Sequence, residues 1–263
     1  MSSRQRFALG TQVSTLARRS VVRTLRQPAQ LVPAFIFPLF LLAVNTGGLQ
    51  RATRIPGFPT HSYLTFALAI PFMQGALFSV MNAGTDLARD IESGFLNRLA
   101  LTPLRGPALL AGLLAGAIVT ALAQAITYIL VGLAAGASFA AGFAGVAVIF
   151  ALAMLITLGF GAIGLFAALR TGSGEAVQGL FPVLFVTLFL SSMSLPRNLI
   201  HTAWFREVAT YNPVSYLIEA IRSLLITGWN AQALELGFGL AAAIALAAMV
   251  AASSALKSRL ART

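Results

Sequence analysis

Few residues of this chain could do chemistry, and none of them is arranged for it. The sequence has seven acidic residues, two histidines and no cysteine. His61 and His201 stand alone, and no HExxH pattern or paired aspartates could hold a metal or act as a general base. A P-loop needs a lysine after glycine, but Lys257 follows Leu256. We therefore expect no catalytic residue, no metal and no cofactor in this chain.

The acidic residues are expected in loops or near helix ends. They are Asp86, Asp90, Glu92, Glu175, Glu207, Glu219 and Glu235. The main polar residues inside apolar segments are neutral: Asn45, Gln74, Asn82, Gln124 and Tyr128. Proton- and sodium-coupled transporters generally place ionisable groups or unwound helices near the midplane of the membrane. Ion coupling is therefore disfavoured but stays open, because neutral oxygens can hold sodium.

The composition is that of an integral membrane protein. Of the 263 residues, 58% are hydrophobic and only 10% are charged, against about 25% charged in a soluble domain. Six segments approach the roughly 20 residues that a helix needs to cross the hydrocarbon core. They are 31–49, 63–84, 108–134, 142–169, 176–195 and 232–256. The segments are too long and too continuous for barrel strands, so the sequence predicts an all-α membrane protein with six transmembrane helices.

The positive charges predict the orientation of these helices. Most of the 18 lysines and arginines fall in the N-terminal arm, in the loop between the second and third segments, at position 170 and in the tail. Cytoplasmic loops carry such an excess, so we expect both termini in the cytoplasm. Because the charges flank apolar segments, the net charge of +11 does not indicate nucleic-acid binding.

We expect one transmembrane domain over 1–263, made of a cytoplasmic amphipathic helix within 1–30, a six-helix bundle at 31–256 and a cytoplasmic tail at 257–263. In the first helix one side carries Leu9, Val13, Leu16, Ala17, Val21 and Leu25, and the other carries Arg18, Arg19, Arg23 and Arg26. This arrangement suits a helix that lies along the anionic cytoplasmic leaflet. A simple positively charged topology anchor is the alternative.

The loop 86–107 has mixed charges and contains a short helix-like stretch that ends at Thr102-Pro103. An apolar ridge of Phe95, Leu96 and Leu99 would stand beside Asn97 and Arg98. A short exposed helix with such a ridge suits docking in the groove of a partner protein. A helix that packs on its own bundle would give the same pattern.

The loop 196–231 is long and unusually apolar. Asn212-Pro213 is a helix-start signal, because asparagine can cap a helix and proline fits its first turn. Apolar residues then recur at helical spacing at Leu217, Ile221, Leu224 and Leu225. Glu219 and Arg222 are three positions apart and could pair. The segment predicts a short helix that dips into the outer leaflet as a re-entrant element, where protein or a water-filled cavity must cover its ends.

With these two loops in this order, the chain resembles the permeases of ABC type-2 exporters, and within that family the drug-resistance permeases of daunorubicin-exporter type. The family's cytoplasmic pattern, an acidic-basic start followed by Gly-x-Leu-x-Arg-Leu and Thr-Pro, is matched by Asp90, Gly94, Leu96, Arg98, Leu99, Thr102 and Pro103. Its later pattern, Asn-Pro-x-x-Tyr followed by Glu-Ala-x-Arg, is matched by Asn212, Pro213, Tyr216, Glu219, Ala220 and Arg222. The acidic-basic cluster is lighter here than is usual in the family.

The resemblance implies a membrane-spanning subunit of an ATP-driven exporter in a prokaryotic cell membrane. A separate ABC ATPase would bind ATP and magnesium, and a second permease copy or a homologue would complete the pathway. The contact with the ATPase would lie at Asp90, Glu92, Gly94, Phe95, Leu96, Arg98 and Leu99. The N-terminal amphipathic helix would also rest on the ATPase.

By the same resemblance, the re-entrant segment with Asn212, Pro213, Tyr216, Glu219 and Arg222 would line the outer end of the path. The substrate cavity would be lined by Phe35, Phe40, Phe72, Phe78, Phe181, Phe185 and Phe189, together with Phe37. Such an apolar aromatic wall suits amphiphilic or lipid-like cargo, such as a drug, a lipid or a glycoconjugate. Lipid contact or helix packing is the alternative role for these phenylalanines. Two other classes stay open for the whole chain: a stand-alone secondary transporter or channel, and a membrane scaffold that transports nothing.

Overall fold

The computed structural model describes residues 9–100 and 106–261, without the side chains of residues 9, 97, 99, 100 and 107. Several residues named above therefore lie outside the description: Thr102, Pro103 and the side chains of Leu9, Asn97 and Leu99. Within the described residues all regular structure is helical. This confirms the predicted all-α class.

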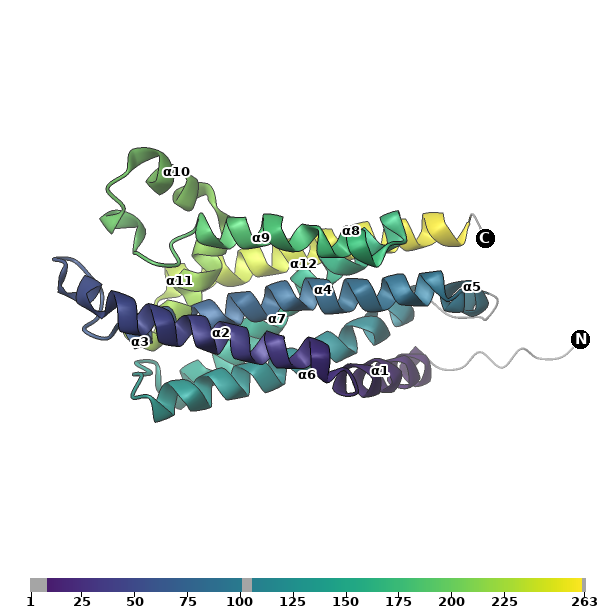
Figure 1. The fold of residues 1–263 in the computed structure, drawn as a ribbon, viewed down its shortest axis with the longest axis horizontal. Coiled ribbons are helices and arrows are strands. Elements are labelled where there is room, and N and C mark those ends of the chain that lie inside the picture. The colour runs from purple at the N-terminus through teal and green to yellow at the C-terminus, as the bar shows by residue number, and fades with distance from the viewer. Residues whose placement is uncertain (1–8, 101–105, 262–263) are drawn as a thin grey trace, which may run out of the picture.

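Five segments are long and apolar enough to cross a membrane. They comprise α2 (Pro28–Leu49) with η1 (Gln50–Arg54), α3 (Tyr63–Ala67) with α4 (Ile70–Glu92), α6 (Gly106–Ala134), α7 (Gly142–Thr171) and α12 (Ala231–Leu260). All five coincide with predicted spans. They run along the long axis of the molecule (Figure 1).

The predicted span at 176–195 has a different form. It consists of the short α8 (Gly174–Gln178) and α9 (Leu180–Phe189), with a break at Gly179, and the helix ends at Phe189. Together these two helices are shorter than the five long segments, and both pack against α4. The count of six transmembrane helices stays a prediction.

The two ends of the bundle carry different elements (Figure 1). At one end lie α1 (Leu9–Leu25), α5 (Phe95–Ala100) and the end of α12. At the other end lie η1, α3, η2 (Arg197–Leu199), α10 (Ala203–Tyr211) and α11 (Pro213–Ile226). The first and last described residues are thus at the same end, as the predicted orientation requires.

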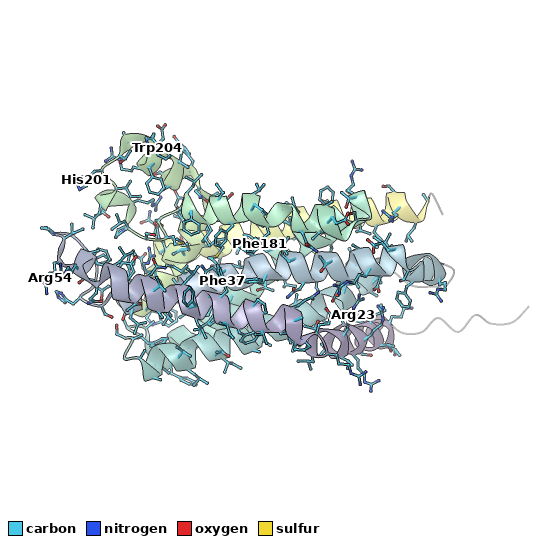
Figure 2. The ribbon with its side chains drawn as sticks, viewed as in Figure 1. Arg23, Phe37, Arg54, Phe181, His201 and Trp204 are labelled. Carbon is cyan, nitrogen blue, oxygen red and sulfur yellow. The ribbon has the colours of Figure 1, made fainter. Side chains whose placement is uncertain are left out.

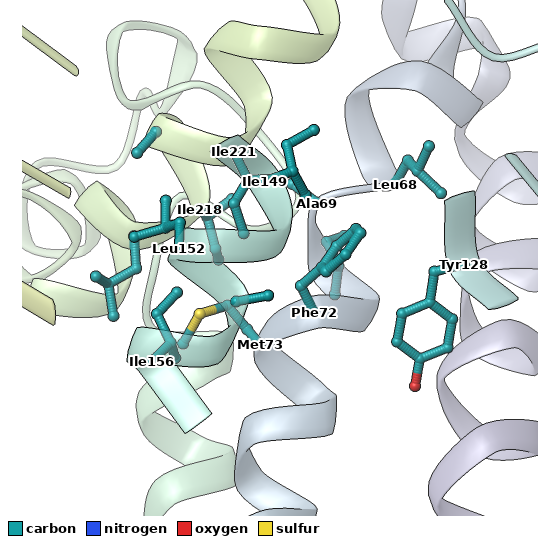
Figure 3. Close-up of a cluster of buried hydrophobic side chains, with 14 of the residues drawn as sticks. Leu68, Ala69, Phe72, Met73, Tyr128, Ile149, Leu152, Ile156, Ile218 and Ile221 are labelled. Atoms are coloured by element: carbon teal, nitrogen blue, oxygen red, sulfur yellow. The ribbon is translucent and has the colours of Figure 1, made fainter. Parts of the chain in front are cut away.

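The packing centres on α7, which lies between α4 and α12 and contacts both over much of its length. Small residues make these contacts close: a side chain at Gly164 would overlap the carbonyl of Val80, and one at Gly159 would press on the backbone of Ala245. Figure 3 shows the side chains of α4, α6, α7 and α11 that fill the centre of this core.

The helix α2 is the least buried of the five and is interrupted by Pro33 and Pro38. Proline has no N–H, so Pro38 leaves the carbonyl of Ala34 without its partner in the helix. Two side chains of α6 bond this oxygen instead, Gln124 through Nε2 at 2.8 Å and Tyr128 through its hydroxyl at 3.1 Å. These bonds attach α2 to α6.

Candidate functional site

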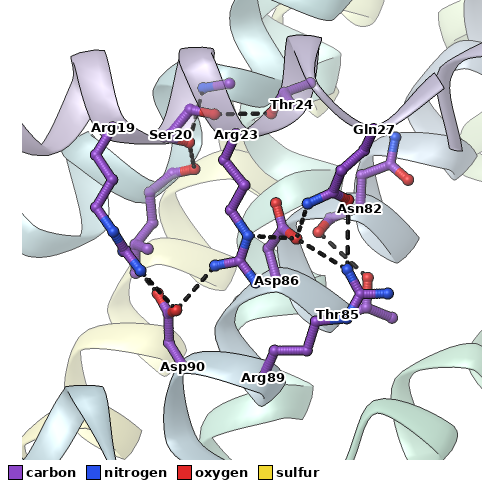
Figure 4. Close-up of polar contacts among 12 residues, drawn as sticks. Arg19, Ser20, Arg23, Thr24, Gln27, Asn82, Thr85, Asp86, Arg89 and Asp90 are labelled. Carbon is purple, nitrogen blue, oxygen red and sulfur yellow. Dashed lines mark hydrogen bonds and ion pairs between the residues drawn. The ribbon is translucent and has the colours of Figure 1, made fainter. Parts of the chain in front are cut away.

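The most concentrated group of charged residues joins α1 to the end of α4 (Figure 4). The guanidinium of Arg19 donates to both carboxylate oxygens of Asp90, at 2.8 and 2.9 Å. Arg23 donates to Asp90 at 2.8 Å and lies 3.2 Å from Asp86. Gln27 donates to Asp86 at 3.4 Å. We call these five residues the ionic cluster.

The local sequence explains why the ionic cluster forms. The arginines are four positions apart on α1 and the aspartates four positions apart on α4, so each pair lies on one face of its helix. On the neighbouring face of α1, Ser20 donates to the carbonyl of Leu113 and accepts from the N–H of Gly116. Glycine at that position lets α1 approach α6 closely, because a side chain there would collide with Ser20.

The burial of Asp90 means that the fold depends on its ion pairs with α1. Asp90 is only 4% exposed, and a buried carboxylate stripped of its cations costs about 3–5 kcal/mol. The hydrogen bonds from Arg19 to Asp90 raise the pKa of the Arg19 guanidinium above its ordinary value. Two guanidinium groups of α1 thus neutralise the buried carboxylate of Asp90.

This geometry corrects two expectations. Asp90 was expected to contact an ATPase, but it is enclosed by the arginines of its own chain. Arg19 and Arg23 were expected to face an anionic leaflet, but they turn toward α4. Arg18 and Arg26 remain exposed, and with Ser14 and Thr15 they line an open groove of about 690 Å³ along α1.

The short helix α5 joins the same assembly. The guanidinium of Arg19 lies 3.9 Å from the centre of the Phe95 ring, within range of a cation–π interaction. Leu96 is 2% exposed and packs in a cluster with residues of α4, α6, α7 and α12. The expected exposed ridge of Phe95, Leu96 and Leu99 is therefore wrong for Leu96, because α5 folds back onto its own bundle. Glu92 and Arg98 are exposed, and Gly94 supplies the turn between α4 and α5 at φ 68°.

The second sequence pattern forms a packed network at the opposite end. The Asn212 side chain accepts from the N–H of Val214 and donates to the carbonyl of Thr187, so it caps α11 and attaches it to α9. The Tyr216 hydroxyl donates to the carbonyl of Thr210 on α10. The predicted helix start at Asn212-Pro213 is confirmed.

Glu219 and Arg222 do not form the expected pair. Glu219 bonds Arg197 at 2.6 Å and accepts from the hydroxyl of Ser192 at 2.9 Å. Arg222 is 5% exposed and donates to the carbonyls of Phe66, Ser192 and Met193. Both side chains instead bind the segment that follows α9: Glu219 binds side chains of that segment, and Arg222 binds its carbonyl oxygens.

The phenylalanines expected in a substrate cavity separate into groups. Phe37, Phe78, Phe181 and Phe185 lie against one another where α2, α4 and α9 meet, with Phe37 and Phe181 labelled in Figure 2. We call these four residues the aromatic seam. Phe189 extends it along α9, with its ring centre 4.9 Å from that of Phe185. Phe72 is not part of the seam, because it packs edge-on against Tyr128 in the core. Phe40 is 60% exposed, and Phe35 is half-buried on α2.

The histidines form no site in the described part of the chain. His61 and His201 are both exposed. Among the described residues, no group of three or more histidine or acidic side chains could hold a metal ion. The ionic cluster, the aromatic seam and the network around Glu219 and Arg222 are the candidate functional features of the described residues.

Comparison with known proteins identifies the class. Residues 11–226 match the family described as ABC-2 type transporter. The chain belongs to this family, and it is the membrane subunit of an ABC exporter. Members of this family generally work with an ABC ATPase as their partner.

The chain is similar to a daunorubicin resistance ABC transporter permease protein, DrrB1, of Streptomyces coeruleorubidus, at 29% identity over 86% of this chain and 80% of the relative. It is also similar to putative transport permeases ycf38 of algae. The identity is 28% for Porphyra purpurea, over 83% of this chain and 76% of the relative. The identity is 25% for Cyanophora paradoxa, over 85% of this chain and 77% of the relative.

Proposed function

We propose that this chain is the pathway subunit of an exporter for amphiphilic or lipid-like molecules and that a separate ABC ATPase powers it through α5. One observation carries the proposal. Arg19 of α1 binds Asp90 of α4 and covers the ring of Phe95 on α5, so three helices meet at a single side chain. A push on α5 would reach α1 and α4 together.

The contacts of Phe95 and Leu96 explain how such a push would be transmitted. Leu96 is anchored in the cluster that contains residues of α4, α6, α7 and α12, and close-packed side chains transmit displacement rather than absorb it. The exposed Glu92 and Arg98 are free to meet the ATPase, and so are Arg18 and Arg26 on α1. In this proposal α1, α5 and the end of α4 move as one rigid unit.

The aromatic seam supports the choice of cargo. Its rings are partly exposed and lie between α2 and α9, beside the apolar faces of these helices. An apolar aromatic surface binds the body of an amphiphile better than an ion or a sugar. The name of the Streptomyces coeruleorubidus relative refers to resistance to daunorubicin, which makes that compound a suitable first probe.

The remaining parts of the proposal concern assembly and location. A second permease copy or a homologue would face α2 and α9, whose exposed side chains include Ile36, Phe40, Val183 and Val186. ATP and magnesium would bind to the ATPase. The end of the bundle with α1, α5 and both described termini would lie in the cytoplasm of a prokaryotic cell, and α10 with α11 would form the re-entrant element at the outer end of the path.

The test is reconstitution of the chain, with the ABC ATPase that co-purifies with it, into vesicles loaded with daunorubicin or a fluorescent phospholipid. ATP-dependent movement of either probe by the complex, and none by the chain alone, would support the proposal. Movement by the chain alone under an ion gradient would instead establish a secondary transporter. If the complex moves neither probe, the proposed cargo is wrong.

A further inference from the structure

Gln74 is the one described buried side chain whose amide oxygen and nitrogen both lack a hydrogen-bond partner among the described residues. It is 1% exposed and lies in the apolar part of α4. An amide can donate two hydrogen bonds and accept two. Leaving a buried amide unbonded destabilises a fold, and this effect is larger in apolar surroundings. Such a group calls for an explanation.

The position of Gln74 indicates which part of the molecule it serves. It precedes Phe78 by four residues, so the two side chains lie on the same face of α4. The ring of Phe78 lies 6.2 Å from that of Phe37 on α2 and 5.6 Å from that of Phe181 on α9. Gln74 therefore stands one helical turn beyond the aromatic seam, toward the α10–α11 end of the molecule.

A second buried polar group without a partner lies on α2, the helix that faces α4 at the aromatic seam. Thr46 of α2 has a buried hydroxyl oxygen that also lacks a partner among the described residues. It comes one turn after the buried Leu42 and is on the same face of the helix. Since α2 and α4 run in opposite directions (Figure 1), Gln74 and Thr46 both lie beyond the aromatic rings on the same side.

The contrast with Gln124 shows that burial alone does not explain Gln74. Gln124 is a buried glutamine of α6 at 3% exposure, and its amide nitrogen bonds the carbonyl that Pro38 leaves free. The fold thus provides a partner for one glutamine and none for the other. A residue that weakens the resting fold while it serves a ligand is a common trade-off at functional sites.

We infer that Gln74 is the hydrogen-bonding site for a neutral polar group of the transported molecule, which stacks its flat apolar body on the aromatic seam. The inference rests on the proposed export function and specifies the class of substrate: an amphiphile with a planar apolar body and an adjacent carbonyl, hydroxyl or amide group. The seam opens to admit it between α2 and α4. The loosely held α2, with its two prolines, is the wall that moves.

The experiment compares Gln74→Leu with Gln124→Leu in the reconstituted complex. For Gln74→Leu we expect the melting temperature without substrate to rise by about 2–4 °C, because an unbonded amide is removed. We expect ATP-dependent daunorubicin transport to fall about tenfold, as for a lost hydrogen bond to substrate. Gln124→Leu should lower the melting temperature, because the Ala34 carbonyl loses a donor.

A fall in melting temperature for Gln74→Leu would overturn the inference, since it would show that the amide is bonded in the resting fold. A rise in melting temperature with unchanged transport would overturn it as well, while the proposed export function would stand. If the wild-type complex moves no daunorubicin, the proposed cargo fails for that probe. The melting temperature of Gln74→Leu then decides the inference: a rise supports an amide that is unbonded in the resting fold, and a fall overturns it.

Discussion

Arg19 and Asp90 are 71 positions apart in the sequence and form a two-pronged ion pair, with N–O distances of 2.8 and 2.9 Å. The pair fixes the N-terminal helix α1 to the end of α4. Because the ring of Phe95 lies under the same guanidinium, α5 also contacts this ion pair. In the proposed coupling, this contact connects α5 with the long helix α4 and with α1.

Replacing Asp90 by alanine should destabilise the protein and impair transport. Arg19 and Arg23 would lose their shared carboxylate, and removal of one partner from a buried ion pair costs about 3 kcal/mol. The melting temperature of the purified chain measures the effect. The matched control is Glu92→Ala, since Glu92 is exposed in the last turn of α4, and it should melt like the wild type. Equal melting of both variants would contradict the role of the ionic cluster.

Replacing Phe95 by aspartate should uncouple ATP hydrolysis from transport. The change removes the ring beneath Arg19 and adds a carboxylate that competes for its guanidinium, while the membrane segments stay unchanged. We expect normal insertion, loss of substrate-stimulated ATP hydrolysis and at least tenfold slower transport. Phe95→Tyr, which keeps the ring, is the control. Wild-type substrate stimulation in the aspartate variant would exclude α5 as the coupling element.

Replacing Asn212 by alanine should loosen the outer end of the bundle by about 2 kcal/mol. The change removes a helix cap, at about 1 kcal/mol, and the hydrogen bond to Thr187 that holds α11 to α9, at about another 1 kcal/mol. Asn230→Ala is the matched control, because Asn230 caps α12 through the N–H of Ala233 at an exposed site. Chemical denaturation of the two variants should separate them, and an equal loss would show that the bond to α9 adds nothing.

Replacing Gly164 by alanine should prevent correct packing of α7 on α4. Its new methyl group would overlap the carbonyl of Val80, which belongs to the backbone and cannot rotate away. Gly239→Ala on α12 is the control, since nothing lies within 4 Å of the added carbon. That control should be neutral or stabilising by up to about 1 kcal/mol. The yield of monodisperse protein in detergent measures both, and a well-behaved Gly164→Ala protein would contradict the described packing.

The sequence was sufficient for the parts of the fold that lipid enforces. Long apolar runs must satisfy their own backbone as helices, and the predicted spans therefore coincide with α2, α4, α6, α7 and α12. Asn212 also fulfilled its prediction as a helix cap, because capping depends on residues only a few positions away.

Contacts between distant segments were harder to predict. The amphipathic pattern of α1 indicated a helix with a basic face but not which acids it would meet. The signal was present in the matching spacing of Arg19 with Arg23 and of Asp86 with Asp90. The burial of Leu96 was missed because an apolar ridge on a short helix looks alike whether it faces a partner protein or its own bundle. Glu219 pairs with Arg197 rather than with Arg222. The fold brings Arg197 close to Glu219, and it gives Arg222 backbone carbonyl oxygens as partners.

The most direct test of the coupling account is a pair of distance measurements in the complex with its ATPase. The chain contains no cysteine, so spin labels can be placed at exposed positions without background. One pair, at Thr15 and Glu92, spans α1 and the end of α4, and the other, at Phe40 and Val183, spans α2 and α9. If the coupling proposal is right, ATP leaves the first distance unchanged and changes the second by several ångströms. Pulsed electron–electron double resonance on spin-diluted samples measures both distances. A change between Thr15 and Glu92 with a constant distance between Phe40 and Val183 would contradict the proposal.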